Sequence, residues 1–93
     1  MCGIAGLINF ENTYTDTIHQ SLYHRGPDAK TQYQDKNLQL IHTRLSIQDI
    51  KNGDQPFVIG QYVIVFNGEI YNHLALRKRL TKHVFKTLCD TET

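Results

Sequence analysis

The sequence lacks the marks of several classes of protein. No apolar run approaches the ~20 residues that a membrane-spanning helix requires, so we expect no membrane partner. The N-terminus has no basic stretch followed by an apolar core, which argues against a secretory signal peptide. Lysine plus arginine (10) almost balance aspartate plus glutamate (9), and the formal net charge of +1 gives no reason to expect a nucleic-acid partner.

Cysteine is scarce, and no metal or phosphate motif is present. Cys2 and Cys89 could form one disulfide at most, and they are too few for a metal site of the C-x-x-C type. The five histidines have no metal-ligand spacing, and there is no glycine-rich phosphate loop. Without an export signal, we expect two reduced thiols in a cytoplasmic protein. Without a metal or phosphate motif, we expect no cofactor bound to this chain.

What is present suits one small folded domain. Apolar residues make up 40% of the chain and charged residues 20%, as in ordinary globular proteins, and 93 residues are too few for two domains. Short apolar segments, rich in β-branched and aromatic residues, predict strands. These strands are expected at residues 4–10, 38–43, 57–59, 62–66 and 84–87.

Two helices are expected between these strands, which makes the predicted fold class α+β. Asp16 is placed to cap a short helix that carries Ile18 and Leu22 on one face, and Asn72 is placed to cap a helix that ends near Leu80. The pair Gly60-Gln61 between two apolar runs favours a hairpin with glycine first in a type II′ turn. Two further turns are expected at residues 24–28 and 52–54.

Cys2 is the strongest candidate for chemistry. A small residue after the initiator methionine favours removal of Met1, and Cys2 would then carry both a thiol and a free α-amine. These two groups titrate near about 8.5 and about 7.7–8.0, so the amine could take the thiol proton near neutral pH. That arrangement is typical of an N-terminal nucleophile. Its position alone favours the alternative, a small buried apolar side chain that happens to be second in the chain.

Other polar residues lie at expected strand ends, and each has a structural alternative. Asn67-Gly68 could supply two N–H donors to an oxyanion, or could be an ordinary turn. Arg44 could hold a carboxylate in a bidentate fork, or could form a surface salt bridge. Glu69 and Asp90 could accept hydrogen bonds from an ammonium group, or could be a turn acid and a helix cap.

The basic run at residues 77–79 is expected to be a solvated helix face. A nucleic-acid-binding module is the alternative, which the near-zero net charge disfavours.

Five segments together resemble the N-terminal glutaminase domain of glutamine-dependent asparagine synthetases. They follow that family's order and spacing over nearly the whole chain, and in this sequence they read Cys2-Gly3-Ile4-Ala5-Gly6, His24-Arg25-Gly26-Pro27-Asp28, Arg44-Leu45-Ser46-Ile47, Asn67-Gly68-Glu69-Ile70-Tyr71-Asn72 and Asp90-Thr91-Glu92-Thr93. One such match would be weak, but five in order favour the nucleophile interpretation of Cys2. Cys89 departs from the family, which commonly has serine there.

The resemblance implies a role for each matching residue. Cys2 would be the nucleophile and, through its amine, the base, while Asn67 and Gly68 would form the oxyanion hole. The substrate would be L-glutamine, with Arg44 on its α-carboxylate and both Glu69 and Asp90 at its α-amino end. The full set of implied glutamine-binding residues is Arg44, Leu45, Ser46, Ile47, Gln48, Asn67, Gly68, Glu69 and Asp90.

The resemblance also implies an N-terminal-nucleophile hydrolase fold, with two antiparallel sheets between helix layers. Because the family's glutaminase domain is longer, residues 1–93 are expected to be its first half, ending on a helix-start signal. ATP, Mg²⁺ and the amidation of aspartate would then belong to a synthetase domain of the same polypeptide that these residues do not contain. The alternative is an inactive fragment that serves only as a folding or interaction module. An incomplete sheet near Val63 and Val65 would invite self-association.

Overall fold

The computed structural model describes the backbone of residues 1–93 and every side chain except that of Asn12. Strands β1, β3 and β2 form one antiparallel sheet with β3 in the centre, and β4 and β5 form a separate antiparallel hairpin. The predicted α+β class is confirmed. In chain order the elements are β1 Gly3–Ile8, the 3₁₀ turn η1 Asn12–Tyr14, α1 Thr15–Leu22, η2 Tyr23–Arg25, β2 Ala29–Asp35, β3 Leu38–Arg44, β4 Phe57–Ile59, β5 Tyr62–Ile64, α2 His73–Arg79 and η3 Asp90–Glu92.

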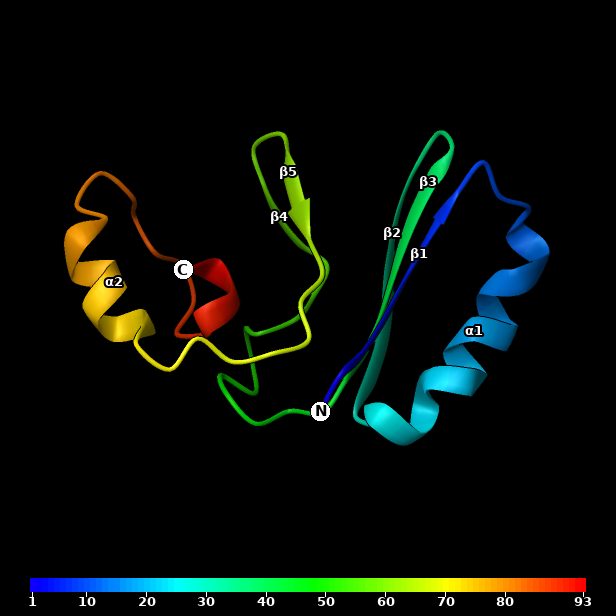
Figure 1. The fold of residues 1–93 in the computed structure, drawn as a ribbon, viewed down its shortest axis with the longest axis horizontal. Coiled ribbons are helices and arrows are strands. Elements are labelled where there is room, and N and C mark those ends of the chain that lie inside the picture. Colours follow the sequence, from blue (N-terminus) through cyan, green and yellow to red (C-terminus); the bar gives the residue numbers. More distant parts are fainter.

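Helix α1 covers one face of the three-stranded sheet (Figure 1). Thr43 donates its hydroxyl to the carbonyl oxygen of Leu22 at 3.1 Å, and Thr15 donates to Gln39 Oε1 at 3.0 Å. Side chains alternate along a strand, so the residues of β3 that face α1 are Gln39, Ile41 and Thr43. His42 and Arg44 therefore face the opposite side of the sheet, toward the loops that follow β3.

Strand β2 was missed by the sequence analysis. Its half-buried positions, Ala29, Thr31 and Tyr33, alternate with exposed polar ones. Threonine and tyrosine at that spacing are a strand signal, but a weak one because no strongly apolar residue carries it. The strand pairs with β3 over its whole length.

The hairpin forms where it was predicted, but it is shorter. Gly60 has a φ of +55°, as the first central position of a type II′ turn requires. Strand β5 ends at Ile64, because the chain then leaves the ladder and the Phe66 N–H donates to the side chain of Gln55. Several hairpin side chains remain exposed, namely Val58, Tyr62 and Ile64.

Helix α2 begins directly after Asn72, as predicted, but neither expected side-chain cap forms. Asn72 makes no capping hydrogen bond, and α1 begins after Tyr14, which leaves Asp16 inside its first turn. The strand expected at residues 84–87 is wrong, because the N–H groups of Lys86 and Thr87 donate to the carboxylate of Glu92 instead of to a neighbouring strand.

The molecule is elongated, with principal extents of 43 × 28 × 18 Å. The sheet with α1 lies at one end, α2 and the C-terminal turn lie at the other, and the hairpin stands between them (Figure 1). Among the described residues, the only buried apolar side chains are those of Ile41, which is 0% exposed, and Cys89, which is 8% exposed. None of the described helices has the length and apolar character needed to cross a membrane.

Candidate functional site

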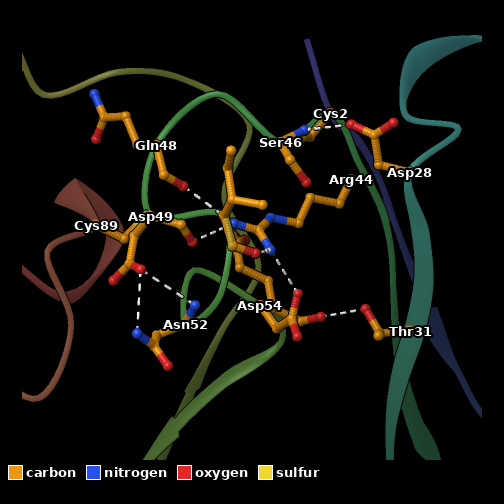
Figure 2. A network of polar contacts seen from close by, with 12 residues as sticks. Cys2, Asp28, Thr31, Arg44, Ser46, Gln48, Asp49, Asn52, Asp54 and Cys89 are labelled. Atoms are coloured by element: carbon orange, nitrogen blue, oxygen red, sulfur yellow. Dashed lines mark hydrogen bonds and ion pairs between the residues drawn. The ribbon is translucent and has the colours of Figure 1, made fainter.

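One cavity of about 280 Å³ gathers segments that lie far apart in the sequence. It lies where the ends of β1 and β3 meet the segment after β5 and the C-terminal turn. The predicted site residues that line it are Cys2, Arg44, Leu45, Ile47, Gln48, Asn67, Gly68, Glu69 and Asp90. Ser46 does not line the cavity: its N–H donates to Asp28 Oδ2 at 2.7 Å and so fixes this segment to the loop before β2 (Figure 2).

Cys2 lies just before β1, with a half-buried free thiol. The N–H of Leu45 donates to its sulfur at 3.4 Å, and the thiol lies 3.8 Å from the carbonyl oxygen of Leu45. On the other side, Arg25 Nε donates to the Cys2 carbonyl oxygen at 3.1 Å. The nucleophile candidate is thus held by both its backbone and its sulfur at the mouth of the cavity.

Arg25 also orients Asn67, a role that the sequence analysis did not assign to it. Both polar groups of the Asn67 amide are satisfied when Nδ2 donates to the Cys2 carbonyl oxygen (3.2 Å) and Oδ1 accepts from Arg25 Nη2 (3.2 Å). An amide nitrogen carries two hydrogens, so one remains to donate toward an oxyanion. Gly26 is needed beside Arg25, because a side chain there would collide with the backbone of Thr43 and Arg44.

Arg44 ends β3 and is 5% exposed, and its guanidinium is bonded to the loop that follows the strand (Figure 2). Nη1 donates to the carbonyl oxygen of Ile50 at 3.0 Å and to Asp54 Oδ1 at 2.8 Å. Nη2 donates to the carbonyl oxygens of Gln48 (3.0 Å) and Asp49 (2.7 Å). All four N–H bonds of the two Nη atoms are therefore used in shaping residues 48–54, and a substrate carboxylate would have to displace some of them or meet the charge from another side.

Asp49 is a second organiser of this loop that the sequence analysis missed. Its φ is +39°, a left-handed conformation that aspartate tolerates better than most residues. The N–H of Leu88 donates to its carboxylate at 2.8 Å, and Asn52 donates to the same carboxylate through its backbone and its side chain. The Leu88 N–H in particular lowers the pKa of Asp49, and so does Asn52. The loop is thereby tied to the C-terminal segment.

Gln55 lines the cavity and joins the two ends of the molecule, a role that was also not predicted. It is 7% exposed. Its side chain donates to Thr91 Oγ1 at 3.1 Å and accepts from the N–H of Phe66, while its carbonyl oxygen accepts from the Thr31 hydroxyl. One residue therefore connects the three-stranded sheet, the end of the hairpin and the C-terminal turn.

Asp90 and Glu69 lie on the side of the cavity opposite the sheet. Asp90 is 5% exposed, and its Oδ2 accepts from the N–H of Ile70 at 2.7 Å. Glu69 is exposed, and its Oε1 accepts from Gln48 Nε2 at 3.2 Å. Asp90 is thus a fixed carboxylate, whereas Glu69 is an open one at the rim.

His42 forms part of the cavity floor and is completely buried on β3. Burial, followed by the nearby Arg44 charge, lowers its pKa from the usual 6.5 to about 4, although Asp54 acts in the opposite direction. His42 is therefore neutral at physiological pH. It contributes a polar, uncharged surface beside the cation of Arg44.

The shifted pKa of His42 predicts how stability depends on pH. The unfolded chain takes up a proton at His42 near pH 6.5 and the folded chain only near pH 4, so the free energy of unfolding should fall as pH drops through this window. We expect a loss of roughly 1–3 kcal/mol from this group. His42→Gln should flatten that slope in denaturant titrations at pH 7.5, 6 and 5, while the exposed control His24→Gln keeps it. Parallel slopes for wild type and His42→Gln would contradict the assignment.

Comparison with known proteins identifies the class. The chain belongs to the glutamine amidotransferase domain family, whose model matches residues 1–93. The resemblance to asparagine synthetases is also confirmed by curated relatives. Asparagine synthetase [glutamine-hydrolyzing] 2 of Bacillus subtilis (strain 168) is 39% identical over 102 residues, and the match covers 99% of this chain and 14% of that protein.

Two other relatives give the same result. Asparagine synthetase [glutamine-hydrolyzing] 1 of Arabidopsis thaliana is 40% identical over 100 residues, covering 99% of this chain and 17% of that protein. A probable asparagine synthetase [glutamine-hydrolyzing] of Dictyostelium discoideum is 39% identical over 103 residues, covering 99% of this chain and 18% of that protein. The chain thus spans less than a fifth of the length of these relatives.

Proposed function

We propose that the protein hydrolyses the side-chain amide of L-glutamine to glutamate and ammonia, with Cys2 as the nucleophile. The observation that carries the proposal is that one cavity of this amidotransferase chain brings the Cys2 thiol, the Asn67 amide and the Asp90 carboxylate together. A nucleophile, a hydrogen-bond donor for developing negative charge and an anionic group for an ammonium are the parts that such a reaction needs.

The proposed reaction has two stages. After removal of Met1, the Cys2 amine takes the thiol proton, and the sulfur attacks the amide carbon of glutamine. Asn67 and Gly68 donate hydrogen bonds to the resulting oxyanion, the protonated amine delivers its proton to the leaving nitrogen, and ammonia departs. Water then attacks the thioester, which releases glutamate and restores the thiol. This hydrolysis requires no cofactor.

Glutamine binding is proposed to use the two sides of the cavity. Asp90 and Glu69 face the α-ammonium group, and the buried charge of Arg44 attracts the α-carboxylate from the opposite wall. Leu45, Ile47 and Gln48, the last of which Arg44 holds through its carbonyl oxygen, line the space between them. Ser46 contributes through its backbone bond to Asp28 rather than by lining the cavity.

The names of the relatives suggest which longer polypeptide would contain residues 1–93. Their names describe glutamine-hydrolysing asparagine synthetases, so we propose that residues 1–93 are the N-terminal part of the glutaminase domain in a larger cytoplasmic enzyme. Its synthetase domain would use the ammonia, with ATP and Mg²⁺, to amidate aspartate. The two antiparallel sheets are compatible with an N-terminal-nucleophile hydrolase fold of four layers, which we propose for the whole domain.

The direct test is a glutaminase assay of the full gene product. Glutamate and ammonia should appear in equal amounts, without ATP or aspartate. The same assay on the isolated 93 residues, combined with sedimentation, tests the alternative of an interaction module. An inactive chain that associates through the exposed hairpin side chains Val58, Tyr62 and Ile64 would favour that alternative for the isolated chain. No release of ammonia by the full gene product would refute the proposal.

A further inference from the structure

Arg77 differs from its basic neighbours on α2, because its guanidinium holds the C-terminal segment. Nε donates to Thr93 Oγ1 at 2.8 Å, Nη1 donates to the carbonyl oxygen of Thr87 at 2.6 Å, and Nη2 donates to the carbonyl oxygen of Cys89. The same guanidinium lies 4.2 Å from the centre of the Phe85 ring. The expectation of a solvated basic face is therefore wrong for Arg77, although residues 78 and 79 are exposed.

These bonds bracket Asp90. Cys89 directly precedes it, and Thr93 directly follows the short turn η3 that Asp90 begins. A 3₁₀ turn of three residues has too few internal hydrogen bonds to fix its own position. The place of the Asp90 carboxylate in the cavity therefore depends on what holds the turn from outside.

Glu92 secures the same turn from another side. Its carboxylate accepts hydrogen bonds from the backbone N–H groups of Lys86 (2.8 Å) and Thr87 (2.7 Å), from the Thr87 hydroxyl (2.8 Å) and from His83 Nε2 (3.1 Å). Burial alone would raise the pKa of Glu92, but these hydrogen bonds outweigh it and lower the pKa from 4.5 to about 2. With Glu92 ionised and fixed in this way, the bonds from Arg77 close the other side of the turn.

The turn is also connected to the oxyanion side of the cavity. Asp90 Oδ2 accepts from the N–H of Ile70 at 2.7 Å, and Ile70 follows the segment of Asn67, Gly68 and Glu69. Helix α2 comes between these two segments in the sequence, and Arg77 projects from it onto the second one. A shift of Asp90 would thus alter the distance between the carboxylate that faces the α-ammonium group and the Asn67 amide that faces the reacting amide of a bound substrate.

We propose that Arg77 is a positioning residue for Asp90 and thereby sets the preference of the cavity for substrates that carry an α-ammonium group. The inference rests on the proposed glutaminase function, in which Asp90 faces that ammonium. A charged contact of this kind depends on placement, since a misplacement of about 1 Å can lower a rate ~100-fold. The effect should be confined to substrates that possess the ammonium.

The test compares two substrates in the full gene product. One is L-glutamine, and the other is 4-carbamoylbutanoate, which is glutamine without its α-amino group. For Arg77→Gln we expect kcat/KM for glutamine to fall about 10- to 100-fold, mainly through KM, while kcat/KM for 4-carbamoylbutanoate changes much less. Arg77→Lys should restore only part of the preference, because an ammonium cannot span the three acceptors as a planar guanidinium does.

The matched control is Arg79→Gln, which removes an exposed arginine of the same helix and should leave both substrates unaffected. Hydrogen exchange of the backbone amides at residues 87–93 should be faster in Arg77→Gln and unchanged in the control. An equal loss on both substrates, or an unchanged preference, would overturn the inference. A wild-type protein that hydrolyses no glutamine would instead refute the proposed function, and the inference would fail with it.

Discussion

Cys2→Ala is expected to abolish glutamine hydrolysis by the full gene product. The substitution removes the only atom of the cavity proposed to bond to substrate carbon, and loss of a nucleophile commonly lowers kcat by about 10⁴-fold or more. Cys2→Ser should be nearly as inactive, because a hydroxyl is a much weaker nucleophile near neutral pH. The rate of ammonia release from glutamine measures the activity of both variants.

The structure supplies a reason to expect these variants to fold. The Cys2 sulfur accepts one long hydrogen bond, from the Leu45 N–H at 3.4 Å, and the bonds of Arg25 and Asn67 are to the Cys2 backbone, which the substitutions keep. Thermal melts of wild type and Cys2→Ala should therefore nearly coincide. In the proposed larger enzyme, synthesis from added ammonia should persist, since it uses a different site.

Processing of the N-terminus provides an independent check on the same mechanism. The proposed base is the α-amine of Cys2, which exists only after Met1 has been removed. Intact-mass analysis of active protein should therefore find the chain without Met1. Hydrolysis by protein that retains Met1, or by Cys2→Ala, would contradict the assignment of Cys2 as nucleophile and base.

Sequence patterns predicted the elements that depend on the conformational preferences of a few neighbouring residues. Gly60 adopts the positive φ that its hairpin requires, and helix α2 starts after Asn72. Strand β2 escaped because its inward positions are an alanine, a threonine and a tyrosine, whose signal is weak until β3 lies beside them. The segment at 84–87 has strand-forming residues, yet the carboxylate of Glu92 takes up its N–H groups. A contact within a few residues of the chain thus overrode propensity.

The motifs named a set of residues of which all but Ser46 line one cavity, but they did not indicate the residues that support this set. Motif spacing named Cys2, Asn67 and Asp90, and the cavity brings them together. Motif spacing could not reveal Gln55 or Arg77, because their importance lies in hydrogen bonds to residues far along the chain. For Gln55 these partners are the Phe66 N–H and the Thr91 hydroxyl, and for Arg77 they are the carbonyl oxygens of Thr87 and Cys89. A polar side chain that binds backbone groups or a distant hydroxyl leaves no complementary charge or motif in the sequence to signal it. Such supports become visible only when the loops are folded against one another.

Arg44 is the clearest case of a supporting role that the sequence did not predict. The sequence offered a substrate fork or a surface ion pair, and the structure adds a third role, which is to hold the loop at residues 48–54. Its partner Asp54 has a side chain that is 62% exposed, whereas the arginine side chain is 6% exposed. An ion pair to so exposed a carboxylate is worth about 0–1 kcal/mol. The bonds to the carbonyl oxygens of Gln48, Asp49 and Ile50 involve a buried charge, for which about 1.5–3 kcal/mol each is typical.

Arg44→Ala is therefore expected to cost on the order of 3–5 kcal/mol of stability, even after water replaces some of the lost bonds, and to disorder the loop at residues 48–54. Asp54→Asn, the matched control, should cost less than about 1 kcal/mol. Arg44→Lys should recover only part of the loss, because an ammonium has three donors and no planar fork. Denaturant titration, with the glutamine KM measured at a temperature where each variant is folded, separates the two roles. A folded Arg44→Lys with a raised KM supports a direct part in binding, and equal losses for Arg44→Ala and Asp54→Asn would show that the exposed ion pair, not the loop carbonyls, holds this arginine.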